Sequence, residues 1–398
     1  MPTRILVTGA TGKVGQAFLS RLFSDSRYAE FTARALVHHR LLEPHDRLEV
    51  VRGSIADRAT VEQAMEGVTH VLHLATVKET PEQIMDVAIK GLFWLLEAAR
   101  TSPTFRQFIL IGGDASVGHF FYRHPAPVTE TQQLSAYPGC YALSKVLEEV
   151  MLEQYYIQYD LNGCCLRAPW IMEKDDFKYS LSFGEDVFGG PRWRDLVGAA
   201  QADEYVRTRT IPVMVDPNGV PVKRNFVHVD DLVSAICLAL DHPAARQQLF
   251  NICMDEPVDY GAVAEYLART RGLPSVKVPT PFWSTWLDNS KARFLLGWRP
   301  EYDLRYFPPQ GAKVGPGEVE SSDRELPHIH YRGGLSCPGK PSSTCNRISS
   351  TRPRPFWPNW ASSPHTPFVT AAACAACGSA APSVTWSCCR SRASRSGV

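Results

Sequence analysis

Residues 8–15 read TGATGKVG, directly after an apolar run at 5–7 and at the start of an amphipathic pattern over 15–22. Glycines at these positions allow a tight turn and let the backbone approach a pyrophosphate, which the free N–H groups and the dipole of a following helix attract. The spacing is Gly-x-x-Gly-x-x-Gly, whereas the commoner fingerprint is Gly-x-Gly-x-x-Gly, and many glycine-rich turns bind no ligand. The strand pattern before the turn and the helix pattern after it favour a nucleotide site, contacted by Gly9, Thr11, Gly12, Lys13, Val14 and Gly15.

The chain up to about Leu304 alternates short apolar runs with longer helical patterns. This alternation is typical of βαβ units and a parallel sheet. We expect strands at 5–7, 32–37, 48–52, 68–74, 108–111 and 163–166, with helices at 15–22, 61–67, 84–99 and 141–156. The predicted fold is therefore α/β, with a Rossmann-like, doubly wound parallel sheet and a smaller C-terminal substrate-binding lobe.

Residues 1–170 are expected to form the nucleotide-binding domain, to which 225–255 return, and 171–305 are expected to form mainly the substrate-binding lobe. A strand pattern at 225–229 precedes a helix that Asp230 or Asp231 caps and that runs to Leu240, and helical patterns also cover 260–270 and 290–296. Residues 175–216 show little periodicity and are interpreted as an insertion that faces the substrate. Six aromatic side chains in or next to this region either line a pocket or simply pack: Trp170, Phe177, Tyr179, Phe183, Phe188 and Trp193.

The last stretch, 306–398, differs in composition from the rest of the chain. After Glu325 it contains no Asp or Glu, while Pro, Ser, Cys and Arg are abundant. This composition is typical of a disordered tail, and a change of reading frame is the alternative explanation. Cys374-x-x-Cys377 has no His partners at ligand spacing, so we predict no metal site there.

The bulk composition indicates small-molecule chemistry. The formal net charge is +1, which provides no broad basic field for a nucleic-acid backbone. No run of 18 apolar residues occurs, and the N-terminus does not resemble a secretion leader. We therefore expect a cytoplasmic protein with neither a nucleic acid nor a membrane as partner.

A second motif, YALSK at 141–145, opens the helical pattern at 141–156. Tyr141 and Lys145 are four residues apart and therefore share one helix face. An ammonium group near a phenol stabilises the phenolate, so that tyrosine can remove or give a proton at a carbinol. A lone Tyr-x-x-x-Lys is common and mostly structural, but its occurrence after the glycine-rich turn favours a catalytic pair.

Together these motifs resemble the extended short-chain dehydrogenase/reductases, and specifically the NAD-dependent epimerase/dehydratase family that acts on nucleotide sugars. The resemblance covers about residues 3–304. It implies that Lys145 also holds the nicotinamide ribose and that Arg224 contacts the substrate diphosphate, and we place Ile55, Leu74 and Ala75 at the cofactor. Further supporting segments are HLA (73–75), GLFWLLEAAR (91–100), LRAP (166–169), RNFVHVDDL (224–232), Asn251-Ile252 and SKARFLLGWRP (290–300).

Two departures from the family pattern concern the reaction site. The family carries Ser or Thr after the fifth strand to hydrogen-bond the reacting oxygen, and alignment on Gly118 puts Gly113 at that position. Ser116 is one candidate replacement, and Asp114 falls where sugar dehydratases of the family carry an acid. The family's Asn before the GLFWLLEAAR helix is replaced by Ala88, which removes a side chain that braces the backbone near the site.

Cofactor choice depends on the end of the second strand, where the sequence reads VHHR at 37–40. A carboxylate there would bind the ribose diol of NAD, whereas a cation favours the 2′-phosphate of NADP. No acid is present, and His38 or Arg40 can meet a phosphate. The sequence therefore predicts an NAD(P) enzyme with a weak preference for NADP, unless this segment is only a solvated strand end.

The function predicted from these features is an NAD(P)-dependent epimerase, dehydratase or oxidoreductase acting at a carbinol carbon of a nucleotide sugar. The sequence does not decide among these three reactions, and it leaves a homodimer open. The rival hypothesis is a non-catalytic NAD(P)-binding sensor or scaffold on the same fold, suggested by the lost hydroxyl at Gly113 and the unusual tail.

Overall fold

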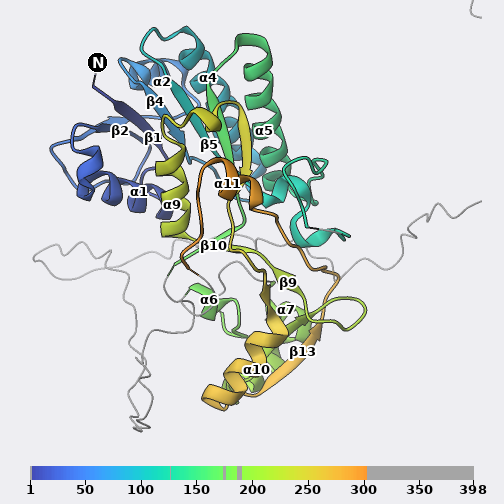
Figure 1. Cartoon of the computed structure of the whole chain (residues 1–398). Coiled ribbons are helices and arrows are strands. Elements are labelled where there is room, and N and C mark those ends of the chain that lie inside the picture. The colour runs from blue at the N-terminus through green and yellow to red at the C-terminus, as the bar shows by residue number, and fades with distance from the viewer. Residues whose placement is uncertain (1, 126, 174–175, 186–190, 303–398) are drawn as a thin grey trace, which may run out of the picture. The chain divides into compact units, whose positions relative to one another are not determined.

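A seven-stranded parallel sheet forms the centre of the computed structural model, which describes residues 2–125, 127–173, 176–185 and 191–302 (Figure 1). The strand order is β11-β6-β5-β4-β1-β2-β3. This confirms the doubly wound sheet and its six predicted strands; β11 adds a seventh. The strands are β1 (Arg4–Thr8), β2 (Thr32–Val37), β3 (Leu48–Arg52), β4 (His70–His73), β5 (Gln107–Gly113), β6 (Gly163–Ala168) and β11 (Gln248–Asn251).

Two groups of helices cover the two faces of the sheet because alternate strand residues point to opposite sides (Figure 1). Ile5 and Val7 of β1 pack in the same core as α1 (Lys13–Ser24) and α9 (Val229–Ala239), whereas Leu6 packs in the core with α2 (Arg58–Met65), α4 (Gly91–Thr101) and α5 (Cys140–Tyr159). The chain runs from β1 to β2 and β3 in one direction and from β4 to β6 in the other. The carboxyl ends of β1 and β4 therefore flank the switch point where ligands bind in such sheets.

The continuous helix expected at 84–99 is interrupted, which corrects the sequence prediction. A short helix α3 (Pro81–Ile84) passes into a π-helical segment η2 (Met85–Lys90) before α4 begins at Gly91. A Cβ atom on Gly91 would come within 2.9 Å of the Ile55 side chain, so the helix approaches its neighbour closely at this point. Such π-helical insertions often mark functional sites, and hydrophobic periodicity alone does not reveal one extra residue in a helix.

The cap predicted for the helix near residue 230 also differs. His228 is the N-cap, and its ring accepts a hydrogen bond from the Asp230 backbone N–H at 3.2 Å. Asp231 instead accepts the backbone N–H groups of Glu301 and Tyr302, at 2.8 and 3.1 Å. Asp231, which was one of the two expected caps of this helix, therefore binds the backbone at the end of the described chain.

Residues beyond β6 build a second core from short elements. The region with little periodicity in the sequence contains α6 (Asp176–Tyr179), α7 (Trp193–Val197), α8 (Ala199–Arg207) and β8 (Ile211–Val215), elements too short to give a clear period. Phe177, Phe183 and Trp193 pack in this core, and Trp170 packs against it and also lines a cleft. Phe188 and the Tyr179 side chain lie outside the described part. The remaining strands and α-helices are β7 (Trp170–Met172), β9 (Lys223–Arg224), β10 (Phe226–His228), β12 (Val258–Asp259), α10 (Tyr260–Arg271), β13 (Ser275–Pro279) and α11 (Ser290–Leu295).

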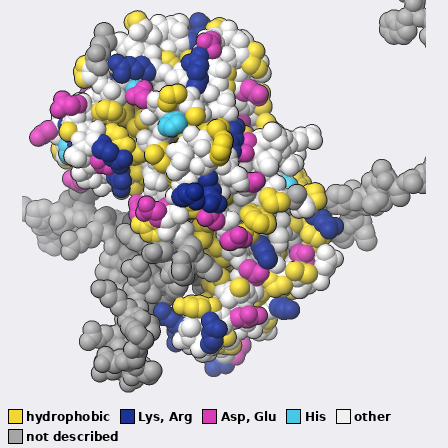
Figure 2. All heavy atoms as spheres, viewed as in Figure 1, with side chains coloured by type: hydrophobic (Ala, Val, Ile, Leu, Met, Phe, Trp, Pro, Cys, Tyr) yellow, Lys and Arg dark blue, Asp and Glu magenta, His cyan; other side chains and the backbone are white. Residues whose placement is uncertain are grey.

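The sequence predicted neither a membrane-spanning segment nor a metal site, and the structure bears on these predictions only for the described residues. Within the described ranges, no helix is long and apolar enough to cross a bilayer, and no group of three potential metal ligands is present. Lysine and arginine side chains are interspersed with acidic ones among the residues coloured in Figure 2. The predictions for 306–398 lie outside the described residues.

Candidate active site

A cleft of about 1420 Å³ opens at the switch point of the sheet. It is lined by the glycine-rich turn, the carboxyl ends of β2, β4 and β5, and the start of α5. All predicted site residues line this cleft except Ser116 and Arg224. Segments that are far apart in the sequence, such as the turn at 8–15 and the YALSK motif, therefore meet in one cleft.

The glycine-rich turn forms a concave backbone surface at the start of α1. Gly9 has a φ of +67°, and a Cβ atom there would lie 2.8 Å from the backbone of Leu74. A Cβ on Gly15 would lie 2.6 Å from Ala10, so the helix can pack against the turn only with glycine at this position. Gly12 is the N-cap of α1, and its own N–H donates to the Gly9 carbonyl at 3.0 Å, which closes the turn. The cradle fits a dinucleotide pyrophosphate, because side chains are absent where a phosphate must approach the backbone.

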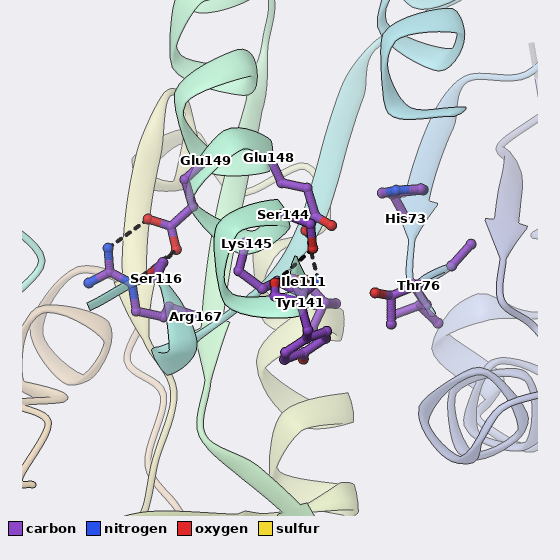
Figure 3. A network of polar contacts seen from close by, with 12 residues as sticks. His73, Thr76, Ile111, Ser116, Tyr141, Ser144, Lys145, Glu148, Glu149 and Arg167 are labelled. Carbon is purple, nitrogen blue, oxygen red and sulfur yellow. Dashed lines mark hydrogen bonds and ion pairs between the residues drawn. The ribbon is translucent and has the colours of Figure 1, made fainter. Parts of the chain in front are cut away.

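Tyr141 and Lys145 lie on successive turns of α5, and both reach the cleft (Figure 3). The Lys145 ammonium nitrogen lies 5.8 Å from the centroid of the Tyr141 ring and donates to the Ile111 carbonyl at 3.3 Å. Burial alone would lower the pKa of Lys145, but the negative charge of Glu148 and the phenol of Tyr141 raise it above the ordinary value. Lys145 therefore stays protonated at the pH where Tyr141 would act.

The loop after β4 fixes the start of this helix through a residue that the sequence analysis missed. Glu79 accepts the backbone N–H groups of Cys140 and Tyr141, at 2.9 and 3.3 Å, and thus caps α5. The neighbouring Lys78 ammonium lies 5.0 Å from the Tyr141 ring centroid. No local capping signal could reveal Glu79, because it is 61 residues before the helix it caps.

The end of β2 presents basic side chains to the same cleft. His38, His39 and Arg40 are exposed and line the cleft, and the two imidazole rings lie 3.6 Å apart. A group bound at this strand end would thus meet nitrogen donors, whereas the segment 37–40 offers it no carboxylate.

Ser116 belongs to a buried ion-pair network that lies outside the cleft lining (Figure 3). Its hydroxyl donates to Glu149 at 2.8 Å. Arg167 binds the same carboxylate with two nitrogens, at 3.1 and 2.7 Å, and all three side chains are buried. The hydroxyl is therefore engaged with Glu149 and is not available to a substrate in this geometry.

Asp114 lines the cleft and is the first member of a buried polar chain that includes His119 and Arg224. The Asp114 carboxylate is hydrogen-bonded to His119 Nδ1, and Arg224 Nη2 is hydrogen-bonded to His119 Nε2. Arginine can only donate, so Nε2 must accept and Nδ1 must carry the proton that Asp114 accepts. The Arg224 guanidinium is fully buried, with its central carbon 3.7 Å from the Trp170 ring centroid and 4.1 Å from that of Phe120.

Comparison with known proteins shows which family the first part of the chain resembles. Residues 5–172 match the model of the NAD dependent epimerase/dehydratase family. The N-terminal part of the chain is therefore similar to this family over those residues.

Relatives of this family align with most of the described chain. The UDP-glucose 4-epimerase of Mycolicibacterium smegmatis is 26% identical over 321 residues, which cover 76% of this chain and 95% of that protein. UDP-glucuronate 4-epimerase 3 of Arabidopsis thaliana is 25% identical and covers 76% of this chain and 74% of its own length. A short-chain dehydrogenase/reductase superfamily protein from Agrobacterium tumefaciens, solved with bound NAD, has a TM-score of 0.64 and 27% identity, with 76% and 94% coverage.

The departure from the family pattern at Gly113 leaves space beside the Tyr141/Lys145 pair. A Cβ atom on Gly113 would lie 3.6 Å from Lys145 side-chain carbons and 3.8 Å from the Tyr141 hydroxyl, which are ordinary van der Waals distances. A Cβ on the preceding Gly112 would instead meet the Cys165 sulfur at 2.7 Å. Position 113 therefore faces the Tyr141/Lys145 pair and has room for a Cβ atom.

Proposed function

We propose that this protein is an NAD(P)-dependent epimerase/dehydratase-type enzyme that acts at a carbinol carbon of a nucleotide sugar. The observation that carries the proposal is the presence of the Tyr141/Lys145 pair in the same cleft as the glycine cradle. Relatives that are 4-epimerases of UDP-glucose and UDP-glucuronate support the substrate class. Arg224 does not add support in this geometry, because its guanidinium is fully buried and hydrogen-bonded to His119.

In the proposed mechanism, Tyr141 is the general acid/base at the carbinol oxygen. A bound nicotinamide supplies or accepts hydride at the adjacent carbon. Lys145 stabilises the phenolate form of Tyr141 by its charge and is held by the Ile111 carbonyl. Glu79 fixes the first turn of α5, so that Tyr141 is presented to the cleft from a rigid helix. Asp114 accepts a hydrogen bond from His119 Nδ1–H and so offers a substrate hydroxyl an acceptor, not a donor.

Two experiments on the purified full chain test this proposal. Mass spectrometry of the nucleotide that co-purifies should find NAD(H) or NADP(H). A screen of nucleotide sugars, followed by absorbance at the nicotinamide band and by product analysis, should find one that is epimerised, dehydrated or oxidised. Tight cofactor binding without turnover of any of them would favour the sensor or scaffold hypothesis.

We also propose the preference for NADP, on the exposed basic side chains at the end of β2. Arg40→Ala should weaken NADP binding by about tenfold, because a charge-assisted contact with the 2′-phosphate is lost, while NAD affinity changes little. Fluorescence titration with both cofactors measures the difference. Arg21→Ala removes an exposed arginine on α1 outside the cleft lining and serves as the control. Equal losses of affinity for the two cofactors would show that Arg40 does not bind the 2′-phosphate and is only a solvated residue at the strand end.

A further inference from the structure

Glu148 is a buried acid that the mechanism above does not use. It lies about one turn after Lys145 on α5, with 0% of its surface exposed. One carboxylate oxygen, Oε2, lies 2.7 Å from the Lys145 ammonium nitrogen (Figure 3). The other, Oε1, is buried without a hydrogen-bond partner among the described residues. Lys145 thus has a counter-ion inside the protein, at a fully buried helix position.

Stability alone does not account for this carboxylate. Burial raises the pKa of Glu148, Lys145 opposes the shift, and the neighbouring charge of Glu149 adds to it. A carboxylate with one unsatisfied oxygen is costly to bury, and replacing a buried ion pair by apolar side chains is often neutral or stabilising. Leu152, one turn further along the same buried face, shows the residue type that packing favours there.

Besides Glu148, the phenol of Tyr141 and the thiol of Cys165 raise the pKa of Lys145, but neither group is a carboxylate. The Ile111 carbonyl of β5 is a neutral acceptor, and burial together with the Lys145 charge lowers the pKa of His73 on β4 to about 3, so that this ring is neutral. Burial and the charge of Glu149 raise the pKa of the Cys165 thiol on β6. Glu148 provides the single carboxylate in ion-pair contact with Lys145 within the described ranges.

We propose that Glu148 is a positioning residue of the Tyr141/Lys145 pair, acting as the internal counter-ion that keeps Lys145 charged and fixed while it faces the cofactor and Tyr141. This inference rests on the proposed function of the same cleft. Without Glu148, the desolvation of Lys145 is no longer offset, and its ammonium loses its proton at lower pH. A neutral amine holds both the nicotinamide ribose and the Tyr141 phenolate less strongly.

The test is the pH dependence of cofactor affinity, which requires no substrate. NADH and NADPH binding to the full chain is measured by fluorescence between about pH 6 and about pH 10, a range that spans the ordinary lysine pKa. Wild-type affinity should stay level across most of this range, because the pKa of Lys145 is raised. Glu148→Gln should bind equally well near neutral pH and lose about tenfold in affinity by the upper end, as a charged donor becomes neutral. Glu148→Met removes the charge with an apolar side chain of similar length and should behave likewise.

Glu149→Gln is the matched control, because Glu149 is an adjacent buried carboxylate that contacts Arg167 and Ser116 and not Lys145. It should lower the melting temperature and leave the pH dependence of binding at that of wild type. A pH dependence in Glu148→Gln or Glu148→Met that matches wild type would overturn this inference alone. Absence of cofactor binding by the wild-type protein would overturn the proposed function, and this inference with it.

Discussion

Tyr141→Phe is expected to lower turnover by about 10²- to 10⁴-fold, the usual contribution of general acid/base catalysis, and to leave cofactor affinity near that of wild type. The hydroxyl is the atom that exchanges a proton with the carbinol, while the ring that packs at the start of α5 is retained. Initial rates on the substrate found by the nucleotide-sugar screen, together with cofactor titration, measure the two effects separately.

The control for this variant is Tyr159→Phe, which removes an exposed tyrosine hydroxyl from the far end of the same helix and should have no effect on turnover. If Tyr141→Phe turned over its substrate at a rate close to that of wild type, Tyr141 would not be the acid/base. The reaction would then depend on another group in the cleft, and the sensor or scaffold hypothesis would gain support.

Gly113→Ser is expected to raise turnover, by up to about 10²-fold, which is the usual effect of one hydrogen-bond donor to a developing oxyanion. The new Cβ fits at ordinary contact distances beside Lys145 and Tyr141. Neither candidate replacement donates to a substrate in this geometry: Ser116 donates to Glu149, and Asp114 accepts a hydrogen bond from His119. Rates of the variant and wild type on one substrate measure the gain.

Two controls separate the hydroxyl from the added bulk. Gly113→Ala adds the Cβ without the donor and should give no gain, whereas Gly112→Ser points toward Cys165 and should mainly destabilise the fold. Ser116→Ala should likewise cost stability and leave turnover nearly unchanged. A sharp loss of turnover in Ser116→Ala or Asp114→Asn, with no gain in Gly113→Ser, would show that one of them replaces the missing hydroxyl.

The parts of this structure that could be predicted from the sequence have a regular hydrophobic pattern or belong to a short motif. The six strands, the glycine turn and the YALSK helix depend on local periodicity and on backbone constraints, both of which are visible in a window of a few residues. The π-helical segment η2 was missed because one extra residue hardly changes the apolar pattern of a long helix.

The parts of the site that were missed depend on contacts between distant segments. Glu79 caps a helix that begins 61 residues later, and Arg224 meets His119 across 105 residues. Glu148 was missed for a different reason: it is close to Lys145 in sequence, but an acid on a helix is normally solvated, and only the buried environment makes it noteworthy.

The Glu79 cap has a consequence for the dynamics of the protein. The loop after β4 lines the cleft and also holds the first N–H groups of α5, so any ligand that orders this loop also restrains fraying of that helix end. Thermodynamic reciprocity requires that a firmer helix end strengthens ligand affinity by the same factor. Amide hydrogen exchange at Cys140 and Tyr141 would then slow on cofactor binding, although neither N–H touches the glycine cradle.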